Sequence, residues 1–301
     1  MSTPAHTETT QTAAATTPAA AGLPDVQFAQ TGGFRTAYYQ GGPTSGTPII
    51  LLHGGGAGAD SVSNWERCFW RFAEFAPTYA VDLVGFGNSD APDPAAFAYT
   101  QESRNIQLIA FVEALGIGPA HFIGNSMGGA TSLGVAMRRP DLVESLVLMG
   151  SAGRSAHMSD ELKTIINYDF TLDGMRKVIA ALANPGFIPS EHQVSYRHEM
   201  SLRPHLAAAY KATMGWVREH GLQYPPADIA KIKTRTLVVN GKEDKVVPIE
   251  QAFEFLTLLE NSTGYLVPHC RHWAMIEYPE LFTKICRDFF MDTTVYGRTG
   301  A

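Results

Sequence analysis

The sequence is poor in cysteine, in positive charge and in long apolar runs. Its three cysteines are Cys68, Cys270 and Cys286, which are widely scattered and lack the spacing of a metal site, so they predict reduced thiols in a cytoplasmic protein. The net charge of -6 argues against nucleic acid or an anionic membrane as a partner. No apolar run approaches the roughly 18 residues of a membrane span. The fractions of hydrophobic residues (45%) and charged residues (17%) are ordinary for a soluble globular protein.

The first 23 residues contain no Lys or Arg, and the first basic residue is Arg35. A secretory signal begins with basic residues and continues with an apolar stretch, and a mitochondrial presequence is rich in arginine. The Thr/Ala/Pro-rich segment 1–23 has neither pattern. We expect a disordered tail.

Strand patterns alternate with helical patterns through most of the chain, which is typical of a parallel sheet with helices on both faces. Strands are expected at 26–30, 34–40, 48–52, 79–83, 121–124, 145–149, 236–240 and 265–268, and helices at 64–75, 101–115, 130–138, 251–259 and 280–291. From 151 to 233 only helical patterns occur, at 160–170, 174–183, 190–201 and 204–219. The sequence therefore predicts an α/β core at 24–152 and 233–301 with an inserted helical cap at 153–232.

The segment 121–129 has the pattern of a nucleophile elbow, with Ser126 at the apex of Gly-x-Ser-x-Gly between a strand and a helix. The turn is strained, and the flanking small residues let the two backbones approach. By contrast, no helix is expected after the similar pattern at 85–89, because Pro92 and Pro94 follow. That second pattern predicts a structural turn.

A glycine-rich loop at 53–59 follows the 48–52 strand and leaves backbone N–H groups unshielded. In hydrolases such a loop supplies one donor to an oxyanion hole. A phosphate-binding loop is the competing interpretation, but no Gly-Lys-Ser/Thr follows.

A serine nucleophile needs a base and an acid that orients the base, in the chain order Ser, acid, His. Asp244 lies in a loop after the 236–240 strand, with Glu243 as the rival acid. His272 lies between the last strand and the last helix, and His269 is its competitor. The spacing of the histidines and carboxylates does not match a metal site. Catalysis by a serine, a histidine base and an orienting acid needs no cofactor.

With these residues, the chain resembles the α/β-hydrolase superfamily and, more narrowly, the meta-cleavage product hydrolases, which break carbon–carbon bonds in aromatic catabolism. Four segments carry the narrower resemblance: 52–59 followed by Asn64-Trp65, Gly124-Asn125-Ser126-Met127-Gly128-Gly129, 241–248 around Asp244, and His272-Trp273. The resemblance implies an eight-stranded, mostly parallel sheet. It also implies hydrolysis of 2-hydroxy-6-oxo-hexa-2,4-dienoates to a 2-hydroxypenta-2,4-dienoate and a carboxylic acid. A carboxylesterase or lactonase with the same triad and a non-catalytic binding protein are the alternative functions.

The resemblance also implies roles for single residues. It makes Ser126 the nucleophile, His272 the base and Asp244 the orienting acid, and it places the oxyanion hole at the N–H groups of Gly55 and Met127. Substrate contacts are expected from Asn64, Asn125, Trp273 and a cap arginine, for which Arg197 is the best match and Arg203 the alternative.

The chain departs from the family pattern at Ala57, where Pro is usual, and at Arg271, where Gly is usual. We expect Ala57 to loosen the oxyanion loop slightly. Arg271 either points outward or alters the chemistry beside the histidine. The acyl-side substituent, the pathway and whether the protein is a homo-oligomer stay open at this stage.

Overall fold

The computed structural model describes residues 22–154 and 158–292. Most of the predicted tail, residues 1–21, lies outside the described residues. Within the described ranges, no helix is long and apolar enough to cross a membrane.

Eight strands form one sheet in the order β1-β2-β4-β3-β5-β6-β7-β8, which confirms the predicted fold class. The hairpin strands β1 and β2 run antiparallel to each other, β2 runs antiparallel to β4, and the other neighbours are parallel. The strands are β1 Gln27–Thr31, β2 Phe34–Gly41, β3 Ile49–Leu52, β4 Thr78–Val81, β5 Ala120–Asn125, β6 Val143–Met149, β7 Thr236–Gly241 and β8 Ser262–Val267. Every residue of β3, β4, β5 and β7 is buried, because helices cover both faces of the sheet.

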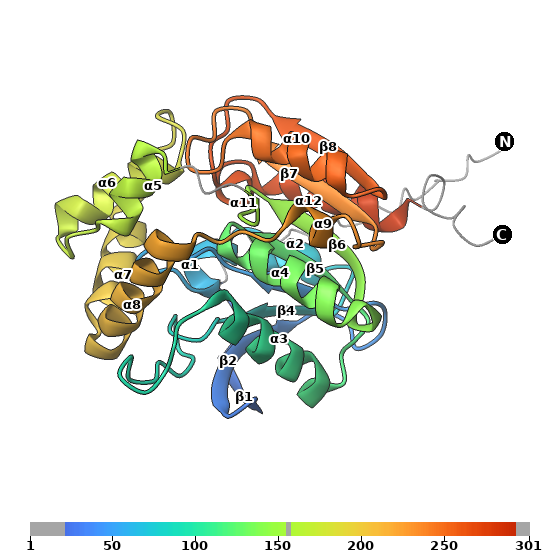
Figure 1. The fold of residues 1–301 in the computed structure, drawn as a ribbon, viewed down its shortest axis with the longest axis horizontal. Coiled ribbons are helices and arrows are strands. Elements are labelled where there is room, and N and C mark those ends of the chain that lie inside the picture. The colour runs from blue at the N-terminus through green and yellow to red at the C-terminus, as the bar shows by residue number, and fades with distance from the viewer. Residues whose placement is uncertain (1–21, 155–157, 293–301) are drawn as a thin grey trace, which may run out of the picture.

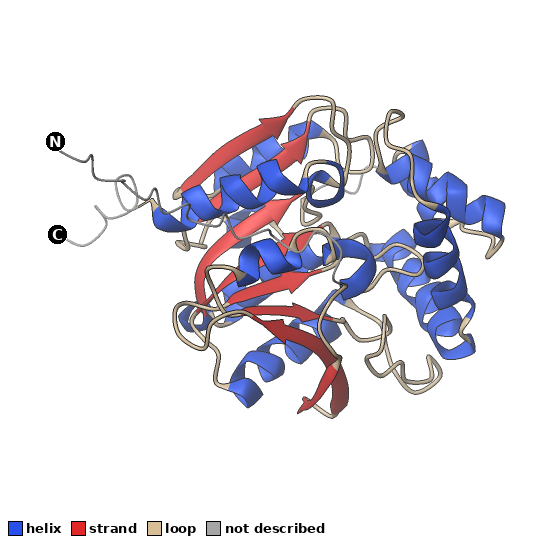
Figure 2. Cartoon of the chain, turned by 180° about the vertical axis from the view of Figure 1, so that it is seen from behind, coloured by secondary structure: helices blue, strands red, loops and turns tan. Residues whose placement is uncertain are grey.

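The helices of the core divide between the two faces (Figures 1 and 2). One face carries α3, α4 and α10, while α2 and α12 pack together on the other face. The core helices are α1 Ser61–Trp65, α2 Phe69–Ala73, α3 Gln101–Leu115, α4 Met127–Arg138, α10 Ile249–Leu258, α11 Ala274–Glu277 and α12 Pro279–Met291, with a 3-10 turn at Pro140–Leu142.

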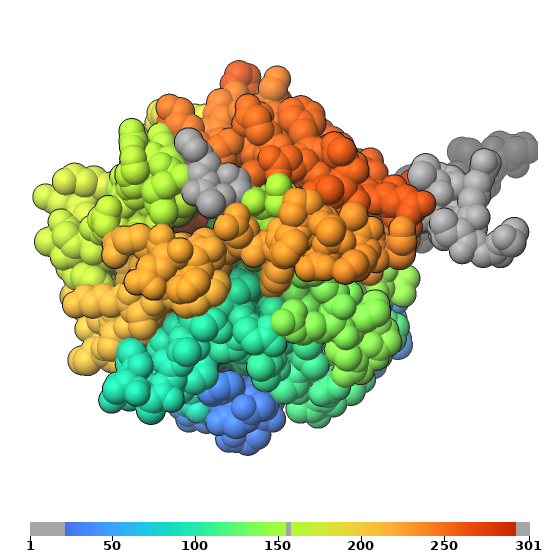
Figure 3. Space-filling view, viewed as in Figure 1, coloured from blue at the N-terminus to red at the C-terminus, as the bar shows by residue number. Residues whose placement is uncertain are grey.

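Five helices lie between β6 and β7, and α5 to α8 gather at one end of the sheet (Figure 1). These helices are α5 Asp160–Ile166, α6 Leu172–Leu182, α7 Glu191–Leu202, α8 Pro204–His220 and α9 Pro226–Ile229. The side chains of Ser159, Thr171 and Ser190 cap the amino ends of α5, α6 and α7 by accepting a main-chain N–H bond. In the space-filling view these segments, coloured from yellow-green to orange, cover that end of the molecule (Figure 3). We call α5 to α8 the cap.

The structure corrects the predicted helix at 64–75. It is broken into α1 and α2, because Cys68 N–H bonds to the Trp65 carbonyl three residues back and the thiol of Cys68 donates to the Met275 carbonyl at 3.1 Å. The apolar residues Trp65, Phe69 and Phe72 are all buried on both sides of the break, so their spacing still resembles one helix.

Two smaller corrections concern the last strand and the residues after it. β8 begins three residues before the predicted start and ends at Val267, so His269 is not in a strand but in a turn with φ 56°. Helix α11, which begins immediately after Trp273, was not predicted. Four residues are too short for apolar periodicity to reveal a helix.

Candidate active site

Ser126 stands in a strained turn between β5 and α4, with φ 54° and ψ -115°. A side chain rarely adopts this left-handed conformation, which indicates a functional constraint. The neighbouring glycines are required by space: a Cβ on Gly124 would lie 2.4 Å from the Gly128 carbonyl oxygen, and a Cβ on Gly128 would lie 2.4 Å from that of Leu52. The elbow geometry therefore exists in the fold and presents Ser126 at the carboxyl end of the sheet.

His272 and Asp244 form a buried pair. His272 Nδ1 lies 2.8 Å from Asp244 Oδ2, and the two side chains are 2% and 0% exposed. The other carboxylate oxygen, Oδ1, accepts the N–H groups of Val246 and Val247, each at 2.9 Å. Because a carboxylate only accepts hydrogen bonds, the imidazole must donate from Nδ1, and its Nε2 is then an acceptor. That is the tautomer a general base requires.

The two competing residues have other partners. Glu243 accepts the Cys270 N–H at 3.0 Å through Oε2, so this carboxylate bonds to the main chain rather than to an imidazole. His269 is exposed, and its carbonyl accepts the Tyr278 hydroxyl at 3.0 Å. Neither residue contributes to the pocket described next.

One small pocket between the cap and the carboxyl ends of the strands brings most of the predicted residues together. Its lining includes eight of them: Gly55, Asn64, Asn125, Ser126, Met127, Arg197, His272 and Trp273. Asp244 is absent from the lining because it lies behind His272. These residues come from the loops after β3 and β8, from the junction of β5 and α4, and from α1 and α7, which are far apart in the sequence.

The predicted oxyanion loop lies against the elbow. A Cβ on Gly54 would approach the Ser126 Cβ to 3.4 Å, and a Cβ on Gly55 would approach Met127 Sδ to 3.0 Å. Within the described residues, neither the Gly55 nor the Met127 N–H makes a hydrogen bond. Two main-chain donors are therefore available beside the serine.

Arg197 presents a buried guanidinium to this pocket. It is 1% exposed, it donates to the Ala57 carbonyl at 2.9 Å and to Ser63 Oγ at 3.2 Å, and it lies over the Trp273 ring at 5.2 Å. Burial lowers the pKa of Arg197 to about 10, so it is still a cation at neutral pH. The nearby buried Asp60 carboxylate acts on this cation electrostatically and opposes the lowering of its pKa, but within the described residues the two groups form no salt bridge, and Nε of Arg197 makes no hydrogen bond. The alternative, Arg203, is exposed and donates to Asn88 at 3.4 Å, outside the pocket.

Residues 47–279 match the family model described as the alpha/beta hydrolase fold. The chain is an α/β-hydrolase. This family places nucleophile, acid and histidine in the chain order and loop positions found here.

Similar proteins define the branch of the family. A 2-hydroxy-6-oxo-6-(2'-aminophenyl)hexa-2,4-dienoic acid hydrolase of Metapseudomonas resinovorans is 45% identical over 87% of this chain and 90% of its own length. A 2-hydroxy-6-oxo-2,4-heptadienoate hydrolase of Pseudomonas putida is 31% identical over 86% and 93%. The crystal structure of a serine hydrolase involved in carbazole degradation has a TM-score of 0.81 at 42% identity, covering 88% of this chain and 98% of that one. Within the α/β-hydrolases, the chain thus belongs to the meta-cleavage product hydrolases, which are carbon–carbon bond hydrolases.

Ala57 and Arg271, the two departures from the family pattern, both make hydrogen bonds that connect the core of this α/β-hydrolase with the cap. The carbonyl of Ala57 accepts the Arg197 guanidinium, and Ala57 is fully buried. Arg271 does not line the pocket, and its Nη1 donates outward to the Ala180 carbonyl of α6 at 3.0 Å.

Sequence reasoning missed Asp60 and Tyr196. Asp60 is fully buried, caps the amino end of α1, and accepts the Tyr196 hydroxyl of α7 at 2.5 Å, which joins core and cap beside Arg197. Burial raises the pKa of this carboxyl, and its bonds to Tyr196 and Ser63 oppose the rise. The capping pattern of Asp60 and Ser63 is the signal that could have found it.

Asn125 has a second task besides lining the pocket. Its Nδ2 donates to the carbonyls of Met149 at 3.1 Å and His272 at 3.3 Å, and its Oδ1 accepts Asn64 Nδ2 at 3.4 Å. The side chain thus ties the elbow to the main chain of the histidine. The Oδ1 atom of Asn64 is buried and makes no hydrogen bond within the described residues, which leaves it available to a ligand.

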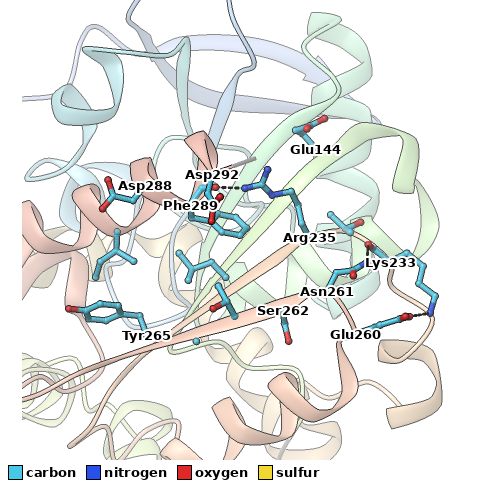
Figure 4. A pocket seen from close by; sticks show the side chains of 15 residues that line it. Glu144, Lys233, Arg235, Glu260, Asn261, Ser262, Tyr265, Asp288, Phe289 and Asp292 are labelled. Atoms are coloured by element: carbon cyan, nitrogen blue, oxygen red, sulfur yellow. Dashed lines mark hydrogen bonds and ion pairs between the residues drawn. The ribbon is translucent and has the colours of Figure 1, made fainter. Parts of the chain in front are cut away.

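A larger hollow lies at the amino ends of β7 and β8 (Figure 4). It has a volume of about 630 Å³, against about 50 Å³ for the pocket at Ser126. No predicted site residue lines it, and its Lys233 and Glu260 already pair at 2.6 Å. The candidate active site is therefore chosen by the chemistry of its lining rather than by its size.

Proposed function

We propose that this chain hydrolyses the carbon–carbon bond beside the 6-oxo group of 2-hydroxy-6-oxo-hexa-2,4-dienoates, giving a 2-hydroxypenta-2,4-dienoate and a carboxylic acid. The observation that carries the proposal is the Arg197 guanidinium, which is buried without a direct salt bridge among the described residues, is influenced by the Asp60 carboxylate only through space, and lines the same pocket as Ser126 and His272. A buried charge is costly unless paired, so a ligand carboxylate is the expected partner. A planar guanidinium binds such a group in a bidentate way.

Ser126 is the nucleophile in this proposal, His272 the base and Asp244 the group that orients the base. After the dienol has become its keto tautomer, Ser126 Oγ attacks the 6-oxo carbonyl and His272 Nε2 takes its proton. The oxyanion lies between the N–H groups of Gly55 and Met127, each of which contributes about 3–4 kcal/mol in comparable sites.

The carbon–carbon bond then breaks, and its electron pair leaves as a dienolate that accepts the proton from His272. A water molecule, deprotonated by the same imidazole, attacks the acyl group on Ser126. The carboxylic acid is released and the serine regains its proton, so one water is consumed in each turnover. The hydrogen bond from Nδ1 to Asp244 stabilises the imidazolium that forms twice in this cycle.

The acyl substituent meets apolar side chains beside Ser126 in this assignment. A second hollow meets the pocket at Ser126 and shares Leu162, Val217, Leu222 and Val246 with it, while Arg218, Glu219 and His220 also line that hollow. Because the shared walls are apolar, we expect 6-alkyl or 6-aryl groups to be hydrolysed faster than substituents that carry a second carboxylate.

The test compares native protein with Ser126→Ala, Arg197→Ala and the matched control Arg203→Ala, whose side chain lies outside the pocket. Loss of the dienolate absorbance is followed for 6-alkyl and 6-aryl substrates, with a nitrophenyl ester in parallel. We expect no turnover without Ser126, a KM for the dienoate at least about tenfold higher without Arg197, and native kinetics for Arg203→Ala. Ester turnover with untouched dienoates would instead identify an esterase or lactonase. Tight binding without turnover would identify a binding protein.

We place this enzyme in the cytoplasm, because its three cysteines are buried and free.

A further inference from the structure

The loop that carries His272 is bonded to the cap through its main chain. His272 N–H donates to the Leu182 carbonyl at 3.0 Å, and the Arg271 guanidinium donates to the Ala180 carbonyl at 3.0 Å. Both carbonyls belong to the last turn of α6, where carbonyl groups have no partner within the helix. The positive guanidinium also lies at the negative end of the helix dipole. Residues 271 and 272 therefore form the carboxyl-terminal cap of a cap-domain helix.

Glu277 of α11 strengthens the same connection. Its Oε1 accepts the Arg271 N–H and its Oε2 accepts the Asn184 N–H, each at 3.1 Å. Asn184 follows α6, so one carboxylate bonds to the histidine loop on one side and to the end of α6 on the other. The contacts of Arg271, His272 and Glu277 with residues 180–184 are called the clasp below.

The pocket and the second hollow that meets it at Ser126 have volumes of about 50 Å³ and 160 Å³, whereas sites for small organic ligands measure about 300–1,000 Å³. We therefore expect the cap to move when a substrate enters. Leu182 at the end of α6 and Arg197 of α7 both line the pocket, and α6 packs against α7. Movement of the cap therefore moves the residues to which His272 is bonded.

We infer that the end of α6 positions the imidazole of His272 through the clasp, with Arg271 and Glu277 as positioning residues. Arg271, where the family usually has Gly, gives this chain one further bond between cap and base. The inference rests on the proposed roles of Ser126 and His272.

The test uses Arg271→Gly, Arg271→Lys and the matched control Arg176→Ala. Arg176 also lies on α6, but it is 44% exposed and pairs with Asp173 and Glu191 at the surface. Two reactions are measured. The first is hydrolysis of a 6-aryl dienoate, described by kcat and KM, and the second is the rate at which a fluorophosphonate probe modifies Ser126. The second reaction needs an aligned base but breaks no carbon–carbon bond.

We expect Arg271→Gly to lower kcat and the probe rate together by about 3- to 10-fold, the effect of one hydrogen bond, with KM nearly unchanged. Arg271→Lys should recover most of both rates, and Arg176→Ala should match the native protein. Glu277→Gln should also lower kcat and the probe rate, because the amide has one oxygen where the carboxylate has two to accept the main-chain N–H groups of Arg271 and Asn184.

Native rates for Arg271→Gly would overturn the inference, whether or not its melting temperature falls. Equal losses in Arg271→Gly and Arg176→Ala would also overturn it, since α6 stability would then be the cause. Probe labelling that persists in Ser126→Ala would refute the nucleophile assignment instead, so the two failures are distinguishable.

Discussion

Replacing Asp244 by Asn should abolish activity while keeping the shape of the site. Oδ1 of Asp244 accepts two main-chain N–H groups at 2.9 Å, and Oδ2 lies 2.8 Å from His272 Nδ1. In the variant, the amide oxygen must take the place of Oδ1, because an NH2 group there would face two donors. The amide NH2 then faces His272 Nδ1 and donates to it.

The imidazole in this variant carries its proton on Nε2, the atom that must accept the proton of Ser126. Imposing the wrong tautomer on a triad histidine costs about 10⁴-fold in kcat. We expect a loss of this size for both a dienoate and a nitrophenyl ester, with a melting temperature close to that of the native protein. Asp244→Ala should be no more harmful than Asp244→Asn, because alanine imposes no tautomer.

Glu243→Gln is the matched control, because Glu243 is the neighbouring carboxylate and bonds to the Cys270 main chain. The reasoning would be refuted if Asp244→Asn kept more than a tenth of the native kcat, or if Glu243→Gln lost more activity than Asp244→Asn. In the double variant Ser126→Ala, Asp244→Asn, kcat should equal that of Ser126→Ala alone, since the residues act as a unit.

Three further predictions follow from the packing. Burial lowers the pKa of His53 to about 4, so between pH 6.5 and 4 the imidazole is protonated mainly in the unfolded protein. The free energy of unfolding should therefore fall by roughly 3 kcal/mol as the pH drops through this range. Denaturant titrations should show a weaker dependence of the unfolding free energy on pH for His53→Gln. Gly128→Ala should give little folded protein, because the new Cβ would lie 2.4 Å from a strand carbonyl. Gly55→Ala should fold but turn over substrate more slowly, because its Cβ would meet a flexible methionine side chain at 3.0 Å. A native melting temperature for Gly128→Ala would contradict this reasoning. Tyr196→Phe removes the 2.5 Å hydrogen bond to the buried Asp60 carboxylate and should destabilise the protein by about 1–3 kcal/mol. We also expect a higher KM for the dienoate, because this bond holds the part of α7 that carries Arg197. An unchanged KM would show that the bond has no part in holding Arg197.

Local patterns in the sequence were enough for the sheet and the elbow. Strand and helix periods, glycine spacing and loop order are properties of neighbouring residues, so β3, β5 and α4 were found within a few residues of their bounds. Where the period was ambiguous the prediction was wrong: the buried side chains on both sides of Cys68 keep a helical spacing although the helix is broken there.

The choice between equivalent side chains needed the tertiary structure. Asp244 and Glu243 are adjacent, yet only Asp244 reaches the imidazole, since the loop after β7 turns the Glu243 carboxylate towards Cys270. Arg197 lies in α7 and Arg203 lies six positions later, between α7 and α8, yet only Arg197 lines the pocket.

The sequence by itself determined the fold class and the family, and it supplied the candidate triad Ser126, Asp244 and His272 in its chain order, because these depend on short local patterns. Only the tertiary structure decided which arginine is buried, how Asp60 and Tyr196 join core and cap, and that the His272 loop ends a cap helix. These contacts join segments up to 140 positions apart, and their energies arise from burial and hydrogen-bond geometry that no local pattern specifies.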